Sequence, residues 1–115
     1  MAGTVVSLGG LNREQVIALI VEYANTVDVT RVTGATTLDE DHHHVFCDTD
    51  SADIAITLPA GVADTEYRVC NTGTSGNKVT ITPDGSELLI GENSAFTLND
   101  GESLIVAYEA TEGWA

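Results

Sequence analysis

The chain has 115 residues and a formal net charge of −14, because 18 Asp and Glu residues oppose four Lys and Arg residues. Proteins bind nucleic-acid backbones and anionic membranes through cationic side chains, so this charge argues against both kinds of partner. The length suits a single domain, and since only 5% of the residues are aromatic, we expect a core built mainly from Val, Ile, Leu and Ala.

The sequence lacks the patterns of a membrane span, a secretory signal and a disulfide framework. Its longest apolar run, residues 16–21, is far shorter than the ~18–20 residues that cross a membrane. Residues 1–4 have no basic region followed by an apolar stretch. We therefore expect a chain made in a cytosol, in which Cys47 and Cys70 remain buried or inert thiols.

Residues 1–11 predict an extended arm that ends in the hinge Gly9-Gly10, since they are small, nearly uncharged and rich in Gly and Thr. The middle of this arm has strand propensity, and an extended segment of this kind can add to the edge of another protein's sheet through main-chain hydrogen bonds. The residues expected to make this docking contact are Thr4, Val5, Val6, Ser7 and Leu8.

Residues 12–27 predict a helix, because Asn12 is a favourable N-cap and Gln15 completes a capping-box pattern. Apolar residues recur at spacings of four, three and four, and further apolar residues widen this stripe over most of the circumference. Such a helix either packs on its own β-domain or packs between subunits, or does both. The stripe that would hold subunits together consists of Val16, Ile20, Tyr23 and Val27.

Residues 28–115 predict a β-domain, since the apolar period changes to two and turn signals recur every eight to twelve residues. Ile54, Ile56 and Leu58, for example, alternate with smaller or polar residues. We expect a mainly β fold, a small antiparallel β-sandwich or barrel-like domain, preceded by the extended arm and the single α-helix. The expected strands are 27–33, 43–47, 55–58, 66–71, 78–82, 86–90, 95–98 and 103–108.

Six short segments of this β-region stand in a characteristic order. They are Phe46-Cys-Asp48, Ile54-Ala-Ile-Thr-Leu-Pro-Ala60, Tyr67-Arg-Val-Cys-Asn-Thr-Gly73, Gly76-Asn-Lys-Val-Thr-Ile-Thr-Pro-Asp-Gly85, Gly101-Glu-Ser-Leu104 and Gly113-Trp114. In order and spacing, residues 38–114 resemble a β-domain that recurs in structural proteins of tailed-bacteriophage virions, in head-attached and tail-fibre proteins alike. Similar chains often continue after Gly-Trp with one more strand, whereas this chain ends one residue after Trp114.

The resemblance implies a virion structural protein without enzymatic activity. We expect it to form a homotrimer. We expect a capsid decoration (cement) or head-fibre protein on the outer surface of the virion, which docks on the major capsid protein or another virion protein through its N-terminal region and displays an acidic β-domain outward. A tail-fibre, tail-tip or baseplate-associated protein with a host-surface-binding β-domain is the alternative. A third interpretation is a non-viral β adhesin or binding module that shares the architecture by convergence.

The run His42-His43-His44 is the candidate metal site. If these residues lie on a strand, His42 and His44 project to one face and His43 to the other. Two imidazoles from each of three chains around a three-fold axis would make a six-nitrogen metal site, and phage fibres use His-x-His pairs in this way. A single chain offers only these two same-face ligands, with Asp39, Glu40 and Asp41 as further candidates. The other interpretation is a solvated strand edge beside acidic residues, with no cofactor bound.

Other chemistry has little support in the sequence. The carboxylates of Glu40, Asp41, Asp48, Asp50 and Asp53 are crowded together, but they lack the spacing of an EF-hand calcium loop. Neither a Gly-x-Ser-x-Gly motif nor a Cys-x-x-Cys motif is present. We therefore expect no catalytic residues.

Overall fold

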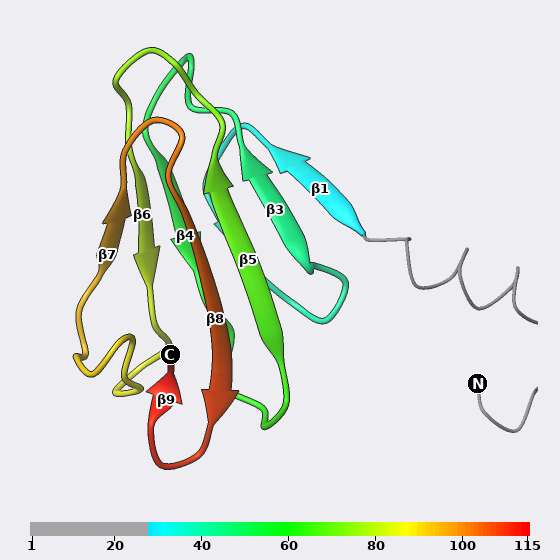
Figure 1. Ribbon diagram of the computed structural model, residues 1–115, viewed down its shortest axis with the longest axis vertical. Helices are drawn as coiled ribbons and strands as arrows, with labels where there is room; N and C mark the ends of the chain where they lie inside the picture. The colour runs from blue at the N-terminus through cyan, green and yellow to red at the C-terminus, as the bar shows by residue number, and fades with distance from the viewer. Residues whose placement is uncertain (1–27) are drawn as a thin grey trace, which may run out of the picture.

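The computed structural model describes residues 28–115, which form two β-sheets (Figure 1). A mainly β domain of sandwich-like architecture is thereby confirmed. The predicted arm and helix, with the proposed contact residues Thr4–Leu8 and Val16, Ile20, Tyr23 and Val27, lie outside the described residues. The strands are β1 (Val29–Val32), β2 (Thr36–Thr37), β3 (His44–Cys47), β4 (Ile54–Thr57), β5 (Glu66–Asn71), β6 (Val79–Thr82), β7 (Phe96–Leu98), β8 (Ser103–Glu109) and β9 (Gly113–Trp114).

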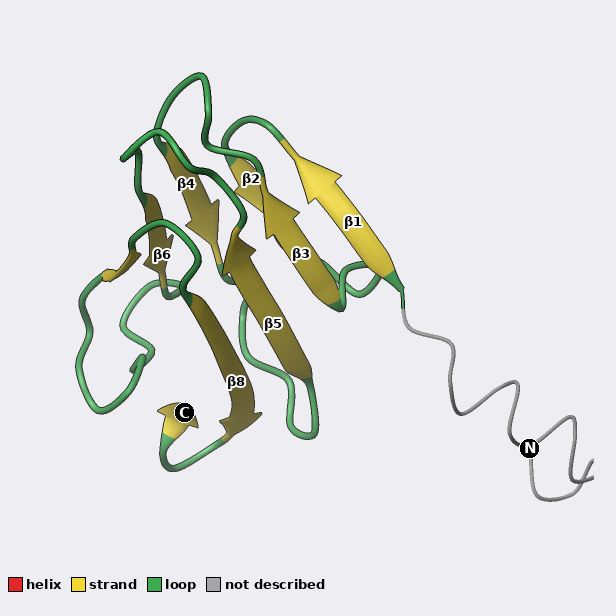
Figure 2. Cartoon of the chain, turned by 45° about the horizontal axis from the view of Figure 1, so that its top comes forward, coloured by secondary structure: helices red, strands yellow, loops and turns green. Residues whose placement is uncertain are grey.

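The strand pairing differs from the expected antiparallel arrangement. The first sheet has the order β1-β3-β5-β8-β9, and the second has the order β2-β4-β6-β7. The pairs β1–β3, β3–β5, β2–β4 and β4–β6 are parallel, and only β5–β8, β6–β7 and β8–β9 are antiparallel. The prediction that the sheets are antiparallel is therefore wrong, because both are mixed: from β1 to β6 the chain alternates between the two sheets and winds forward like a short solenoid (Figure 2).

This winding gives the domain two distinct ends (Figure 1). Because β1, β3 and β5 run in one direction, the chain crosses to the second sheet at one end and returns at the other. We call the end at which these three strands begin the proximal end, since Asp28 enters β1 there. The proximal end comprises connections 38–43, 58–65, 83–95 and 110–112, and the distal end comprises connections 33–35, 48–53, 72–78 and 99–102.

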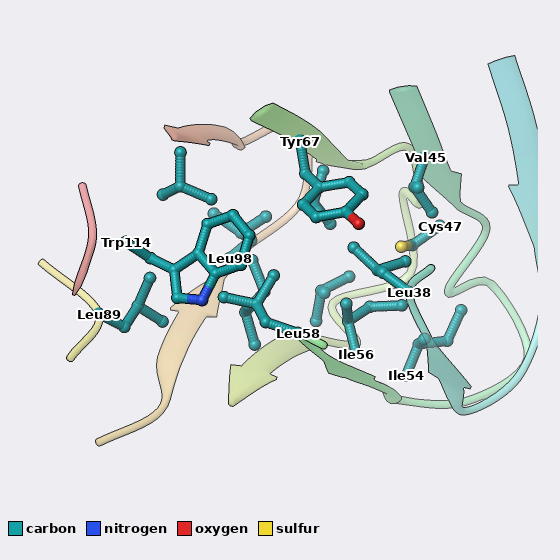
Figure 3. Packing of buried hydrophobic residues seen from close by; sticks show 14 residues of the cluster. Leu38, Val45, Cys47, Ile54, Ile56, Leu58, Tyr67, Leu89, Leu98 and Trp114 are labelled. Atoms are coloured by element: carbon teal, nitrogen blue, oxygen red, sulfur yellow. The ribbon is translucent and has the colours of Figure 1, made fainter. Parts of the chain in front are cut away.

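The hydrophobic core lies between the two sheets and follows directly from the alternation of side chains along each strand (Figure 3). Ile54 and Ile56 of β4 are buried, whereas Ala55 between them is exposed. Val45 and Cys47 of β3 are likewise buried on either side of the exposed Phe46. The remaining buried hydrophobic residues are Leu38, Leu58, Tyr67, Val69, Val79, Ile81, Leu89, Leu98, Val106 and Trp114.

Two polar residues, Thr49 and Asn71, are buried with the core at the distal end and are hydrogen-bonded to each other. The Oγ1 hydroxyl of Thr49 donates to Oδ1 of Asn71 at 2.7 Å, and the Gly73 N–H donates to the same oxygen at 3.0 Å. The Asn71 amide donates in turn to the carbonyl oxygens of Asn77 and Leu98, each at 3.1 Å. Asn71 thus ties two distal connections and the end of β7 together from inside the fold.

The segment 86–90 was expected to be a strand and is not one. Only isolated bridges occur there, from Leu89 to Glu92 and from Leu89 to Trp114. Ile90 and Gly91 have φ values of 52° and 82°, so the chain turns sharply instead of extending. Within residues 28–115, no helix is long and apolar enough to cross a membrane.

Candidate functional site

A hollow of about 660 Å³ opens at the proximal end, where β1, β3 and β5 begin. Its lining combines carboxylates, imidazoles and one guanidinium, because the parallel winding brings the starts of these strands side by side. The titratable lining residues are Asp28, Glu40, His42, His43, His44, Asp64, Glu66, Tyr67 and Arg68.

The histidine run enters this hollow from a turn and not from a regular strand. The backbone N–H of His42 donates to the carbonyl oxygen of Asp39 at 3.1 Å, and Nδ1 of His42 lies 2.9 Å from Oδ1 of Asp39. Strand β3 begins only at His44. The alternation that would place His42 and His44 on one face therefore does not extend to His42.

The other two histidines face different neighbours. Nε2 of His43 lies 3.8 Å from Oδ2 of Asp28, and His44 stands in register with Val29 and Arg68 on the outer face of the first sheet. Residues 28–115 of one chain contain no group of three or more His, Cys, Asp or Glu residues arranged to hold a metal ion. A metal at a three-fold His cluster would need further copies of the chain and stays a prediction.

A second hollow of about 450 Å³ lies beside the first and shares Glu40, Thr65 and Tyr67 with it. Its wall is partly apolar, with Pro59, Val62 and Trp114 among its lining residues. The Tyr67 hydroxyl donates to the carbonyl oxygen of Asp39 at 3.0 Å. Burial, together with the carboxylates of Asp39 and Glu40, raises the pKa of Tyr67.

The carboxylates of the distal end act chiefly as acceptors for main-chain N–H groups. Asp50 accepts from the N–H of Thr74 at 2.8 Å, and Asp53 accepts from the N–H of Lys78 at 2.8 Å. Asp48 accepts from the N–H of Asp50 and pairs with Arg31. Both contacts lower the pKa of Asp48, and the hydrogen bond from Asp50 has the larger effect. These aspartates therefore hold neighbouring connections in place.

Five exposed large hydrophobic residues lie in the proximal connections or at strand ends that adjoin them, which sequence reasoning did not anticipate. Apart from these five, the exposed large hydrophobic residues of the described part of the chain are Phe46 and Ile105, on the outer face of the first sheet. Leu88 and Ile90 lie two residues apart in one connection, between Glu87 and Glu92, and exposed apolar residues in an acidic setting suit contact with another macromolecule better than catalysis. The proximal set is Val29, Val62, Leu88, Ile90 and Phe96.

Both cysteines are free thiols, and they lie on opposite faces of the first sheet. Cys47 of β3 is buried and stands opposite Asn71, whereas Cys70 of β5 is partly exposed and stands opposite Phe46. A disulfide between them would require the backbone to rearrange. Burial, and secondly the proximity of Cys70, raises the pKa of Cys47 to about 12.

We expect Ellman's reagent at pH 8 to modify Cys70 readily and Cys47 only after unfolding, because the thiolate is the reactive species and Cys47 stays protonated. Cys70→Ala should abolish the fast phase, and Cys47→Ala should leave it unchanged. Two fast thiols in the native protein would contradict this assignment.

The same raised pKa predicts how stability changes at alkaline pH. The neutral Cys47 thiol is favoured in the folded state. Its contribution to the free energy of unfolding is therefore fully present below the ordinary thiol pKa of about 8.5 and is lost as the pH rises towards 12. Cys47→Ala should therefore flatten the decline of unfolding free energy above pH 9.

Comparison with models of known protein families finds no match to this chain, and comparison with curated proteins finds none either.

Proposed function

We propose that the chain is a structural protein of a bacteriophage virion, namely a capsid decoration or head-fibre protein that forms a homotrimer on the outer surface. The observation that carries this proposal is the ordered resemblance of residues 38–114 to the β-domain of such proteins. The resembling segments include β4, β5 and β6 and the closing Gly113-Trp114. They thus contain most of the buried hydrophobic residues of the core.

The two ends of the domain support an orientation for this display. The N-terminal region joins the domain at the proximal end, where β1 begins. A domain tethered there would point its distal end outward, away from the particle. The distal connections are polar and closed by their own hydrogen bonds, for example those of Asp50 and Asn71, which suits an exposed tip.

Docking on the major capsid protein is the role we propose for residues 1–11, through the strand-forming residues Thr4–Leu8. Deleting residues 1–11 should weaken binding to capsids that lack the protein by at least about tenfold, since main-chain pairing would be lost. The thermal unfolding of the β-domain should not change. Binding is measured by co-sedimentation, with Thr97→Ser on the exposed face of β7 as a full-length control.

Electron microscopy of the intact particle separates the remaining interpretations. Density for the trimer at local three-fold positions of the head supports the proposal, and density only on the tail favours the tail-fibre or baseplate alternative. If the truncated chain still saturates capsids that lack the protein, the arm does not dock. Absence from the particle altogether would leave the non-viral adhesin interpretation.

A further inference from the structure

The connection between β6 and β7 contains a tight turn with an unusual residue at its tip. The backbone N–H of Leu89 donates to the carbonyl of Glu92 at 2.7 Å, and the N–H of Glu92 donates back at 3.2 Å. Between them, Ile90 and Gly91 have φ values of 52° and 82°. Positive φ at both central residues is the mark of a type I′ turn, for which Asn-Gly is the favoured sequence.

Isoleucine is among the least suitable residues for the first central position of this turn. Its β-branched side chain crowds the backbone at positive φ, so the fold holds Ile90 in a strained conformation. The only other non-glycine residue with positive φ in the described part of the chain is Asp64, whose short polar side chain tolerates it. Packing does not explain the isoleucine, because 46% of Ile90 is exposed.

The strained tip is held firmly against the rest of the domain. The N–H of Ile90 donates to the carbonyl of Trp114 at 2.7 Å, and the N–H of Trp114 donates to the carbonyl of Leu88 at 2.9 Å. Trp114 itself is fully buried. The fold therefore presents the Ile90 side chain to solvent from a rigid support, which is how a protein offers a preorganised contact residue.

The surroundings of Ile90 indicate the chemistry of what it would contact. Leu88, with 36% of its surface exposed, lies two residues before it in the chain, and Val62 and Phe96 are exposed at the same end of the domain. Acidic residues occur in every proximal connection, including Glu87 and Glu92 next to the tip. Arg68 is the one Lys or Arg that the described strands and connections place at this end.

These charges disfavour a second copy packed end to end, because carboxylates would meet carboxylates. They favour a basic partner surface. We propose that the proximal end is a second docking contact, in which Ile90 inserts into an apolar pocket on a basic surface of the same virion protein that receives the N-terminal region. Both contacts can reach one partner since the N-terminal region joins the domain at this end. The inference rests on the function proposed above.

The test uses Ile90→Asn, which removes the apolar side chain and relieves the strain at once. Asn accepts positive φ, so the thermal midpoint of the full-length protein should rise by about 4–8 °C. Binding to capsids that lack the protein should weaken by about tenfold or more, because the buried anchor is lost. Ile90→Gly is a second variant with the same expected loss of binding.

The matched control is Ile105→Asn, which removes an isoleucine that is 54% exposed on β8, opposite Arg68 and outside the proximal connections. It should bind capsids as the wild type does and should not raise the thermal midpoint. Wild-type binding should also weaken steeply with added salt, since a basic partner surface is proposed.

The outcomes separate the two proposals. Wild-type protein that binds neither capsids nor tails overturns the virion function, and the docking contact with it. Wild-type binding that Ile90→Asn and Ile90→Gly leave unchanged overturns the contact alone. A fall in both thermal midpoint and binding for Ile90→Asn would show that Ile90 serves the fold instead. Binding that is indifferent to salt would contradict the basic partner.

Discussion

Replacing Asn71 by alanine is expected to lower the free energy of unfolding by about 3–4 kcal/mol, because buried groups that lose their partners cost about 1–3 kcal/mol each. The Asn71 side chain accepts from the Thr49 hydroxyl and the Gly73 N–H and donates to the carbonyls of Asn77 and Leu98. Thr49 and Asn71 are both fully buried, so water does not readily replace these bonds. Urea denaturation followed by circular dichroism measures the loss.

The control for this substitution is Asn99→Ala at the same end of the domain. The Asn99 side chain only accepts an exposed hydrogen bond from Lys78 Nζ at 2.8 Å, so its loss should change the free energy of unfolding by no more than about 0.5 kcal/mol. A similar small effect for both substitutions would mean that the Asn71 network contributes little to stability. Asn71→Leu, which fills the volume but makes none of the bonds, should be nearly as harmful as Asn71→Ala.

Most strand positions could be predicted from the sequence, because they depend on local alternation. Residues 66–71 form β5 with the expected bounds, and six more expected strands differ from the observed ones by one or two residues at their ends. β2 (Thr36–Thr37) and β9 (Gly113–Trp114) were missed, since strands of two residues carry no periodicity. The pairing of β2 with β4 supplies the hydrogen bonds that make it a strand.

The pairing of the strands could not be predicted, because turn residues mark where a chain bends but not which sheet it enters next. Asn99-Asp-Gly101 looks like a hairpin turn, yet it joins β7 of the second sheet to β8 of the first. The alternation of Ile54 and Ile56 with their neighbours would look the same in a parallel or an antiparallel sheet with one buried face. Only long-range pairing decides between them.

The candidate site, like the fold, could be predicted from the sequence only in part. The histidine run was found from its composition, but its neighbourhood with Asp28 and Arg68 arises from the parallel stacking of β1, β3 and β5. Ile90 fell within the expected strand 86–90. Its positive φ is contrary to the backbone preference of isoleucine and therefore could not be predicted from the sequence.

Replacing Trp114 by alanine is expected to cost about 3–5 kcal/mol of unfolding free energy, the range for large-to-small changes of a buried aromatic residue. Trp114 is fully buried, and its ring centroid lies 5.5 Å from that of Tyr67 and 5.2 Å from that of Tyr108. The indole closes the core at the proximal end beside Leu89 (Figure 3). Since Trp114 is the single tryptophan of the chain, circular dichroism must replace fluorescence as the probe.

Trp114→Phe separates the packing of the ring from its polar atom. Nε1 of Trp114 is buried and has no hydrogen-bond partner among the described residues, so phenylalanine gives up no bond there. It loses only part of the ring volume, and we expect a cost of about 1–2 kcal/mol. Equal losses for the Phe and Ala variants would show that the complete indole, including its N–H, is required. A small loss for both would mean that β9 is held by its backbone bonds to Leu88 and Ala107 and not by the buried ring.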